Sequence, residues 1–344
     1  MDVGGILSCD CLMRLPCAKR SLTMPVMTKQ DRLDGLTVCF AGSGEFGVPT
    51  LAALVDLGAK VLCVYSQPDK PAGRGSKLTP TPVSNFGIER GMNLIRTEDL
   101  NVEPMPDCDV LVVIAFGQKI SDDVISRPRL GAVNLHASRL PKYRGAAPIH
   151  WAVINGDAIA GNSVIRLAQR MDAGSVLAMS SVEVPSSMTT GELHEVLSKD
   201  GAVLVPRVLS ELHGGTSKPI EQDHTQATRA PKLTRQTSVI DWNRSSAEIA
   251  NLIRGLFPWP GCRVRLMDGE QAVATVTLVR GIAHTQLNVS TGQSGVIDDA
   301  GQVITGSGTI EIVEIQPQGG RVMTLAAFRN GKPWVAGMRL ESVE

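Results

Sequence analysis

The sequence predicts an α/β fold in its first part and a smaller part rich in β-strands after it. Three observations lead to this prediction. A strand, a glycine-rich turn, a helix and a second strand follow one another between residues 36 and 65, the order of a parallel βαβ unit. Two more apolar runs, at 109–116 and 132–134, extend that sheet. Beyond residue 256, short strands alternate with glycine and aspartate turns, as in a small β-barrel.

Composition restricts the class of protein. At 344 residues the chain is long enough for two domains, and its 43% hydrophobic and 20% charged residues are typical of soluble globular proteins. No stretch approaches the ~20 apolar residues that cross a bilayer. Lys and Arg balance Asp and Glu at 34 each, so overall charge gives no sign of nucleic-acid binding. The seven cysteines, an odd number without repeated spacing, do not indicate a disulfide framework.

Changes in composition along the chain predict four segments. Residues 1–33 have no helical or strand period and are expected to be a disordered extension, or to precede a true start at Met24 or Met27. The α/β domain is assigned to 34–215, and the polar stretch 216–240 is interpreted as a linker. The barrel is assigned to 241–344. A cytoplasmic location is expected, with organelle targeting by the extension as the alternative.

The glycine-rich turn at 42–47 resembles a dinucleotide-binding fingerprint only in part. The fingerprint requires an acidic residue at the end of the next strand, and that strand instead ends in Ser66 and Gln67. The turn is therefore interpreted as a tight strand-to-helix connection whose backbone amides could face any ligand, and binding of NAD is disfavoured. The long irregular loop at 67–82, interrupted repeatedly by Gly and Pro, is expected to be either functional or a surface insertion.

The elements that follow are each predicted from local pattern. A helix is expected at 147–155 and strands at 163–168 and 182–185. Thr189 and Glu192 form a capping-box pattern that opens an amphipathic helix to Leu212, which Pro206 is expected to kink or divide. Six further segments are predicted in the second part. They are a helix at 247–256, strands at 262–266, 272–278, 295–297 and 309–315, and a last helix at 324–328.

Polar side chains end the strand that begins at Ala132. Asn134, His136 and Ser138 are two residues apart, so a strand would present all three on one side. An arbitrary strand end of this kind is more often structural than catalytic. Asp172 lies in a turn beside a glycine and could supply a negative charge to the imidazole.

These residue types suit acyl transfer to a nucleophile supplied by the substrate. The sequence has no G-x-S-x-G nucleophile motif. When an amine attacks a formyl carbonyl, charge builds on the oxygen, and an Asn amide and a charged His can both donate to it. A nearby carboxylate favours the charged imidazole and can move protons from the amine. Metal binding by His136 is disfavoured, because neither His150 nor Asp172 completes an evident ligand set.

Several motifs together give the chain a specific resemblance. It resembles the methionyl-tRNA formyltransferase family from about Leu36 to the C-terminus. The motifs that carry the resemblance are FAG at 40–42, QPDKPAGRG at 67–75, NLHAS at 134–138, LPKYRGAAPIHW at 140–151, MDAG at 171–174 and IRGLFPWPG at 253–261.

The resemblance implies a Rossmann-like formyltransferase domain followed by an OB-fold-like β-barrel domain. It implies that Asn134, His136 and Asp172 are catalytic, and that the cosubstrate is 10-formyltetrahydrofolate, without a metal. The residues expected at the folate site are Ser138, Arg139, Leu140, Pro141, Ile114, Phe116 and Gly117. Arg139 departs from the family pattern, which has leucine there, and leaves its contact with folate open.

The implied partner is methionyl initiator tRNA. The protein is expected to be a monomer and to have no membrane partner. The residues expected to contact tRNA are Lys70, Arg74, Lys77, Lys232 and Arg254. Residues 229–265 carry seven cations and two acids, which favours a phosphate-binding stripe once the resemblance is considered. Two alternatives stay open: a formyltransferase acting on a nucleotide-linked amino sugar, and a non-catalytic tRNA- or nucleotide-binding module.

Overall fold

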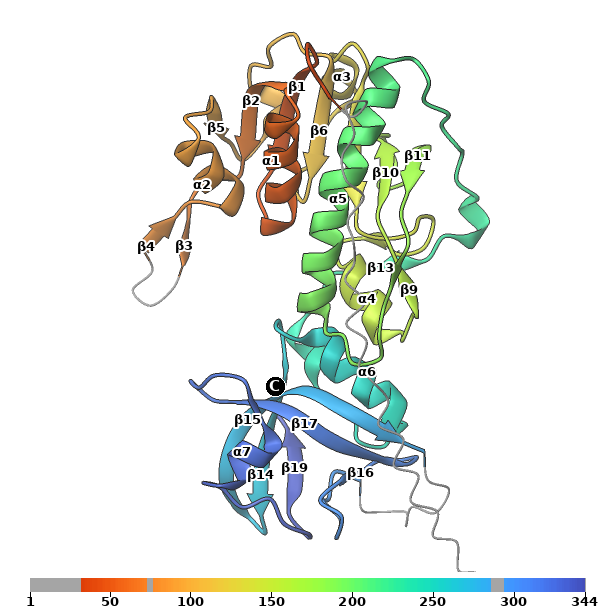
Figure 1. The fold of residues 1–344 in the computed structure, drawn as a ribbon. Helices are drawn as coiled ribbons and strands as arrows, with labels where there is room; N and C mark the ends of the chain where they lie inside the picture. Colours follow the sequence, from red (N-terminus) through yellow and green to blue (C-terminus); the bar gives the residue numbers. More distant parts are fainter. Residues whose placement is uncertain (1–31, 73–76, 286–293, 344) are drawn as a thin grey trace, which may run out of the picture.

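The structure is a computed structural model and describes residues 32–72, 77–285 and 294–343. An α/β domain and a β-barrel are joined by a linker (Figure 1). The packed chain already includes Leu33, which is 2% exposed and whose N–H donates to the carbonyl of Leu57. Within the described ranges, no helix is long and apolar enough to span a membrane.

The α/β domain is built on a seven-stranded sheet with the order β11-β10-β7-β6-β1-β2-β5. Strands β5, β2, β1, β6 and β7 are parallel, and β10 is antiparallel to both β7 and β11. The strands are β1 (Thr37–Gly42), β2 (Lys60–Ser66), β5 (Leu94–Arg96), β6 (Val110–Ile114), β7 (Ala132–His136), β10 (Ser163–Arg166) and β11 (Val176–Met179). The chain order reverses between β1 and β6, and ligands of open α/β sheets bind beyond the carboxyl ends of strands at such a point.

Helices cover both faces of this sheet, because its strands are apolar on both sides. The helices are α1 (Val48–Asp56), α2 (Pro82–Glu89), α3 (Asp122–Ser126), α4 (Pro148–Ile154) and α5 (Thr190–His213). Val38 and Phe40 pack in the core that α1 and α5 cover. Cys39 and Ala41 point to the opposite face, in the core that contains Val124 of α3.

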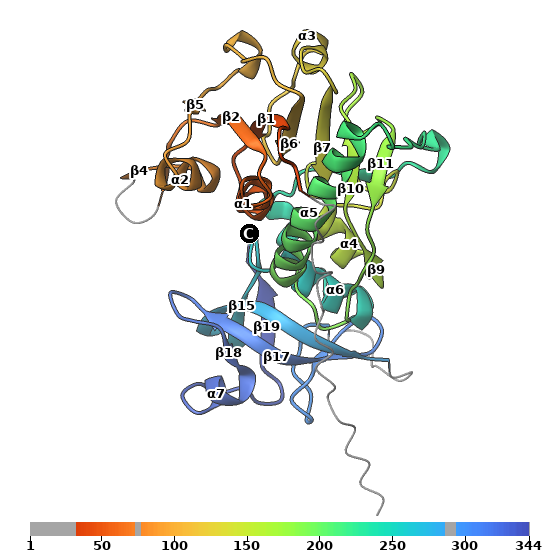
Figure 2. The same ribbon diagram turned by 45° about the horizontal axis from the view of Figure 1, so that its top comes forward.

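Helix α5 confirms the predicted capping box. The Thr189 hydroxyl accepts the N–H of Glu192, and the Glu192 carboxylate accepts the N–H of Thr189 at 2.8 Å. The helix is one element from Thr190 to His213, with Pro206 inside it. It passes beside α1, and its N-terminal end lies next to the barrel (Figure 2).

Three pairs of short strands lie outside the main sheet. They are β3 (Lys70–Ala72) with β4 (Lys77–Thr79), β8 (Arg144–Gly145) with β13 (Arg229–Ala230), and β9 (Ile159–Ala160) with β12 (Val182–Glu183). The β3–β4 hairpin projects from the sheet beyond β2 and α2 (Figure 1).

The C-terminal part is a nearly closed antiparallel barrel around a second hydrophobic core. Its strands are β14 (Cys262–Asp268), β15 (Gln271–His284), β16 (Val303–Ile304), β17 (Thr309–Pro317), β18 (Met323–Thr324) and β19 (Arg339–Ser342), and its helices are α6 (Ser246–Leu256) and α7 (Leu325–Arg329). The sheet order is β16-β17-β15-β14-β19. Val296 bridges Arg339 of β19, and Ile297 bridges Val303 of β16, so this segment connects the two edges.

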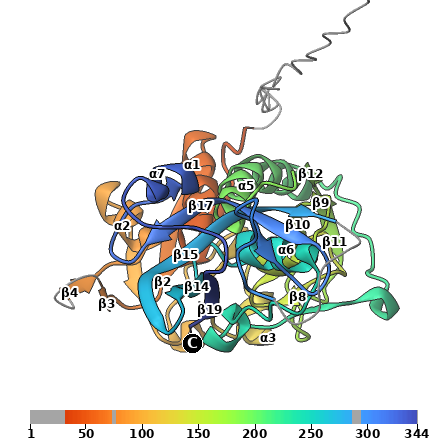
Figure 3. The same ribbon diagram turned by 90° about the horizontal axis from the view of Figure 1, so that it is seen from below.

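Seen from below, the barrel lies over the α/β domain (Figure 3). Helix α6 contacts α5, and it also packs closely on α4. Gly255 of α6 lies so close to α4 that a Cβ there would meet Ile154 at 2.5 Å. The Arg280 guanidinium of β15 donates to Glu192 at 2.6 Å and to Glu314 at 2.5 Å. The carboxylate that caps α5 therefore also fixes the barrel to the catalytic domain.

The predicted fold class is confirmed: an α/β domain precedes a β-barrel. The sequence predictions missed β5, β11, α2, α3 and β19, which are short or carry few apolar residues. Residues 295–297, predicted as a strand, form only isolated bridges.

Candidate active site

The three predicted catalytic residues come from two neighbouring parts of the sheet. Asn134 and His136 alternate on β7, so they share one side of the strand. Asp172 belongs to the loop between β10 and β11, and β10 pairs with β7 through Ile165 opposite Asn134. The carboxyl end of β10 lies beside the amino end of β7, where Arg166 pairs with Val133. The loop that follows turns back, so that Asp172 lies beside His136.

His136 is held between two oxygen atoms. Its Nε2 donates to the carbonyl of Tyr143 at 2.9 Å, because a carbonyl can only accept. Its Nδ1 lies 3.6 Å from Oδ1 of Asp172, which is an ion-pair distance but too long for a hydrogen bond. The side chains of His136 and Asp172 are 7% and 13% exposed, so little water screens them.

Asp172 is fixed through its other oxygen. Oδ2 accepts the backbone N–H of Gly145 at 2.8 Å. A charged acceptor of this kind makes a comparatively strong hydrogen bond. Asp172 is therefore oriented by β8, with Oδ1 directed to the imidazole.

Asn134 is half-buried, and its side chain makes no hydrogen bond to any residue within the described ranges. The Asn134 amide and the Nδ1 side of His136 are consequently the two polar groups of the triad left for a bound substrate. Their arrangement suits donation to a developing oxyanion.

The backbone around the triad has an unusual conformation. The described residues other than glycine with positive φ are Ala115 at 48°, Tyr143 at 61° and Asp172 at 54°. Such conformations cost about 1–3 kcal/mol each and persist where the surroundings enforce them, often at functional sites. Ala115 directly follows β6, Tyr143 supplies the carbonyl to His136, and Asp172 is the triad carboxylate. Tyr143 was missed as a site residue because it acts through its backbone.

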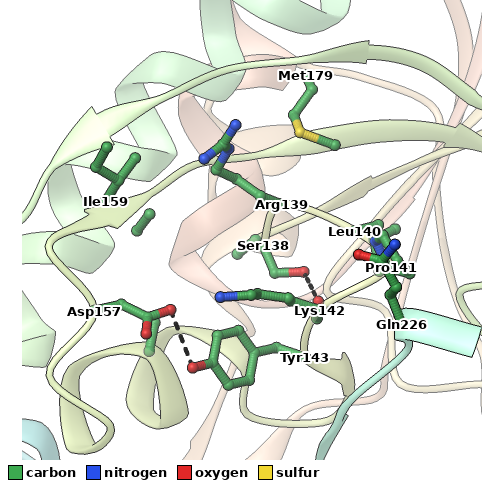
Figure 4. A pocket seen from close by; sticks show the side chains of 13 residues that line it. Ser138, Arg139, Leu140, Pro141, Lys142, Tyr143, Asp157, Ile159, Met179 and Gln226 are labelled. Atoms are coloured by element: carbon green, nitrogen blue, oxygen red, sulfur yellow. Dashed lines mark hydrogen bonds between the residues drawn. The ribbon is translucent and has the colours of Figure 1, made fainter. Parts of the chain in front are cut away.

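The predicted folate residues fall into two groups. Ser138, Arg139, Leu140 and Pro141 line a pocket of about 230 Å³ that also contains Tyr143, Asp157 and Met179 (Figure 4). One end of the pocket is polar, because the Tyr143 hydroxyl donates to the Asp157 carboxylate there at 3.0 Å. Burial raises the pKa of the Tyr143 phenol. None of the triad side chains lines this pocket.

The second group lies at the end of β6 and does not line that pocket. Ile114 and Phe116 are 0% and 2% exposed, so their side chains belong to the cores. Gly117 is exposed, with φ of 75°. This group can meet a ligand through the backbone of 115–117 rather than through the predicted side chains.

Three of the five predicted tRNA contacts are accessible. Lys70 and Lys77 are exposed on the β3–β4 hairpin, and Lys232 is exposed in the linker. Arg74 lies outside the described residues.

The prediction that Arg254 contacts tRNA is wrong. The residue is only 4% exposed and cannot meet a phosphate backbone from its position. Its guanidinium donates to the carbonyl of Met188 at 3.0 Å and twice to Oδ1 of Asn251. Burial lowers the pKa of Arg254. The residue joins α6 to the segment before α5.

We expect Arg254→Met to lower the free energy of unfolding by about 1.5–3 kcal/mol, since a hydrogen-bonded buried charge is lost. The affinity for tRNA should stay within about two-fold, because no phosphate contact is removed. Urea unfolding and filter binding measure the two quantities. Arg321→Met, at an exposed barrel position, is the control and should leave stability unchanged. Loss of tRNA affinity at unchanged stability would restore the original prediction.

Among the described residues, no group of three His, Cys, Asp or Glu side chains is arranged to hold a metal ion. The sheet, the barrel and the Asn–His–Asp site are those expected of a two-domain formyltransferase, and the family profiles identify the chain as one. The formyl transferase family profile matches residues 36–209, and the profile of the formyl transferase C-terminal domain matches residues 232–333. This family uses folate cosubstrates.

Full-length relatives show to which family of formyltransferases the chain belongs. The chain is 35% identical over 306 residues to the methionyl-tRNA formyltransferase of Agathobacter rectalis, covering 86% of this chain and 96% of the relative. It is 36% identical over 311 residues to that of Moorella thermoacetica, covering 88% and 98%. The chain belongs to the methionyl-tRNA formyltransferase family.

Solved structures of other formyltransferases share the fold. WlaRD, a sugar 3N-formyl transferase crystallised with dTDP and 5-N-formyl-THF, aligns with a TM-score of 0.59 at 16% identity. The alignment covers 83% of this chain and 99% of WlaRD. At this identity the likeness establishes the fold and nothing about the acceptor.

Proposed function

We infer that the protein has methionyl-tRNA formyltransferase activity and transfers the formyl group of 10-formyltetrahydrofolate to the α-amino group of methionine on initiator tRNA. The observation that carries this inference is the full-length relationship: both domains match relatives of this activity over nearly their whole length. The Asn–His–Asp geometry supports the inference independently, because the Asn134 amide and the His136 imidazole can donate to the oxyanion that forms during formyl transfer.

The proposed reaction uses the triad as donors and as a proton relay. The amine attacks the formyl carbon, a new C–N bond forms, and the bond from that carbon to N10 of the folate breaks. The Asn134 amide and Nδ1–H of His136 donate to the carbonyl oxygen as it gains negative charge. Asp172, whose Oδ1 lies 3.6 Å from Nδ1 of His136, transfers the proton of the amine toward the departing folate nitrogen.

The folate donor is proposed to bind beyond the carboxyl ends of β6 and β7. Two observations support this site: it lies beside the reversal of strand order, and the exposed backbone at Ala115 and Gly117 has the left-handed conformation that brings peptide groups toward a ligand. The loop with Ser138, Leu140 and Pro141 would form its second wall. Arg139 is exposed at that wall, where its charge could meet a carboxylate of the folate.

The tRNA is proposed to lie along the β3–β4 hairpin and the linker. Lys70, Arg74 and Lys77 would approach the acceptor end, and Lys232 would contact a phosphate farther along. The exposed cations of the linker and barrel, Arg229, Lys232, Arg235, Arg263 and Arg265, support a backbone-contacting surface. The protein is further proposed to act in the cytoplasm as a monomer.

We expect Lys232→Ala to weaken tRNA binding and to reduce the slope of log affinity against log salt by about one, because one phosphate contact is lost. Filter binding over a range of salt concentrations measures both. Lys199→Ala, which removes an exposed cation from α5, is the matched control and should leave the slope unchanged. Equal slopes for the wild type and both variants would contradict the proposal that Lys232 contacts tRNA.

The direct test supplies radiolabelled formyl donor with methionyl initiator tRNA, and in parallel with an amino-sugar nucleotide. Label should appear on the tRNA. Transfer to the sugar alone would replace the proposed acceptor. Binding of tRNA without transfer to either acceptor would favour a non-catalytic tRNA-binding module.

A further inference from the structure

The linker between the two domains passes directly behind the triad. Strand β13 of the linker pairs in parallel with β8, and the carbonyl of Ala230 accepts the N–H of Ala146 at 2.9 Å. The hydroxyl of Thr228 accepts the N–H of Tyr143, whose carbonyl orients His136. Gly145 permits this approach, since a Cβ there would meet Ala230 O at 2.6 Å.

Gln222, at the start of this segment, is the most completely bonded side chain of the linker. It is 8% exposed, and its amide makes four hydrogen bonds. Nε2 donates to the carbonyls of Asp172 at 2.9 Å and Gly174 at 2.7 Å. Oε1 accepts Nε and Nη2 of Arg144 at 3.2 and 2.6 Å. The amide orientation follows from its partners, because two carbonyls require donors and a guanidinium requires an acceptor.

These bonds connect the two backbone segments that position the carboxylate. Gln222 holds the Asp172 loop from its carbonyl side, and it holds β8 through Arg144. The N–H of Gly145, the next residue of β8, then binds Oδ2 of Asp172. Arg144 is further fixed by His224, at 2.8 Å from Nη2, and its pKa is lowered by burial and by repulsion from Arg170.

We propose that Gln222 is a positioning residue for Asp172, so that the interdomain linker is a working part of the active site. The amide sets the distance between the Asp172 loop and β8, and thereby the direction of Oδ1 toward His136. This role rests on the proposed function. Because the same linker carries the exposed cations Arg229 and Lys232, tRNA bound there contacts the segment that holds the catalytic carboxylate.

The first test replaces the amide by a side chain of similar length. Gln222→Met keeps the buried volume and loses all four hydrogen bonds, and kcat for formyl transfer should fall by about 10- to 100-fold, the effect of a small misplacement. The KM for methionyl-tRNA should change by less than about two-fold, since no exposed cation is altered. Gln236→Met makes the same change at an exposed linker position and should match the wild type.

A double-mutant cycle separates positioning from a general structural role. If Gln222 acts through Asp172, adding Gln222→Met to Asp172→Asn should lower kcat little further, because the two act as a unit. Full additivity of the two losses in log kcat would overturn the proposal. So would a wild-type kcat for Gln222→Met.

A folding defect is distinguished by thermal melting of each variant. If Gln222→Met melts below the assay temperature, Gln222→Asn replaces it, because the shorter amide cannot reach both carbonyls and Arg144. A lowered kcat in folded Gln222→Asn supports the proposal, and an unchanged one overturns it. Absence of transfer by the wild type would instead contradict the proposed function, so the two failures are distinct.

Discussion

Replacing His136 by alanine should lower kcat for formyl transfer by about 10²–10³-fold, the usual cost of one oxyanion donor. The imidazole is buried, its Nε2 is fixed on Tyr143 O, and its Nδ1 is left between Asp172 and the space for substrate. No other donor within the described residues occupies this position. Single-turnover transfer with saturating donor and methionyl-tRNA measures the chemical step.

The affinity of His136→Ala for tRNA should remain close to that of the wild type, since the side chain is buried and meets no phosphate. His213→Ala, at the exposed end of α5, is the control and should retain full activity. Parallel loss of turnover and tRNA affinity would mean that His136 supports the fold rather than the reaction.

Asp172→Asn should lower kcat on the order of 10²-fold, the lower range of general acid–base contributions. The amide oxygen of asparagine can keep the bond to Gly145 N–H, so its NH2 group then faces Nδ1 of His136. That arrangement favours the neutral ring, with Nδ1 as acceptor instead of donor. The substitution removes both the charge and the donor while changing the shape little.

The comparison with Asp172→Ala tests this explanation. Alanine also frees the N–H of Gly145, and the melting temperature should therefore fall, whereas Asp172→Asn should melt near the wild type. Asp268→Asn, at an exposed end of β14, controls for loss of one negative charge. Turnover of Asp172→Asn equal to the wild type would exclude a role for the carboxylate in catalysis.

Much of the fold could be predicted because its strands have strong local patterns. The apolar runs that became β1, β2 and β6 are buried on both faces, which gives them continuous hydrophobicity. The spacing of Asn134 and His136 indicated a shared side of β7, as the structure has it. Its place in a turn beside a glycine made Asp172 a candidate charge partner for His136, and the family resemblance implied its catalytic role. Sequence spacing alone does not reveal that the loop after β10 places Asp172 beside His136.

Other features depend on tertiary contacts that sequence patterns do not contain. Arg254 looked like a surface cation, but α6 is covered by α4 on one side and by β15 on the other, so most of its circumference is buried. Gln222 lies in a polar stretch and has no motif of its own. The positive φ of Tyr143 occurs in a loop that the linker holds through Thr228. A tyrosine in the sequence does not indicate such a conformation.

The path of the linker decides where this protein can be divided. A fragment ending at His213 would contain every triad residue, yet it would lack Gln222, Thr228 and Ala230 and would expose the edge of β8. We expect a catalytic fragment to need the chain as far as Pro231, whose carbonyl accepts the indole N–H of Trp151 at 2.8 Å. Proteolytic cleavage between residues 215 and 222 should accordingly be better tolerated than cleavage between 222 and 231.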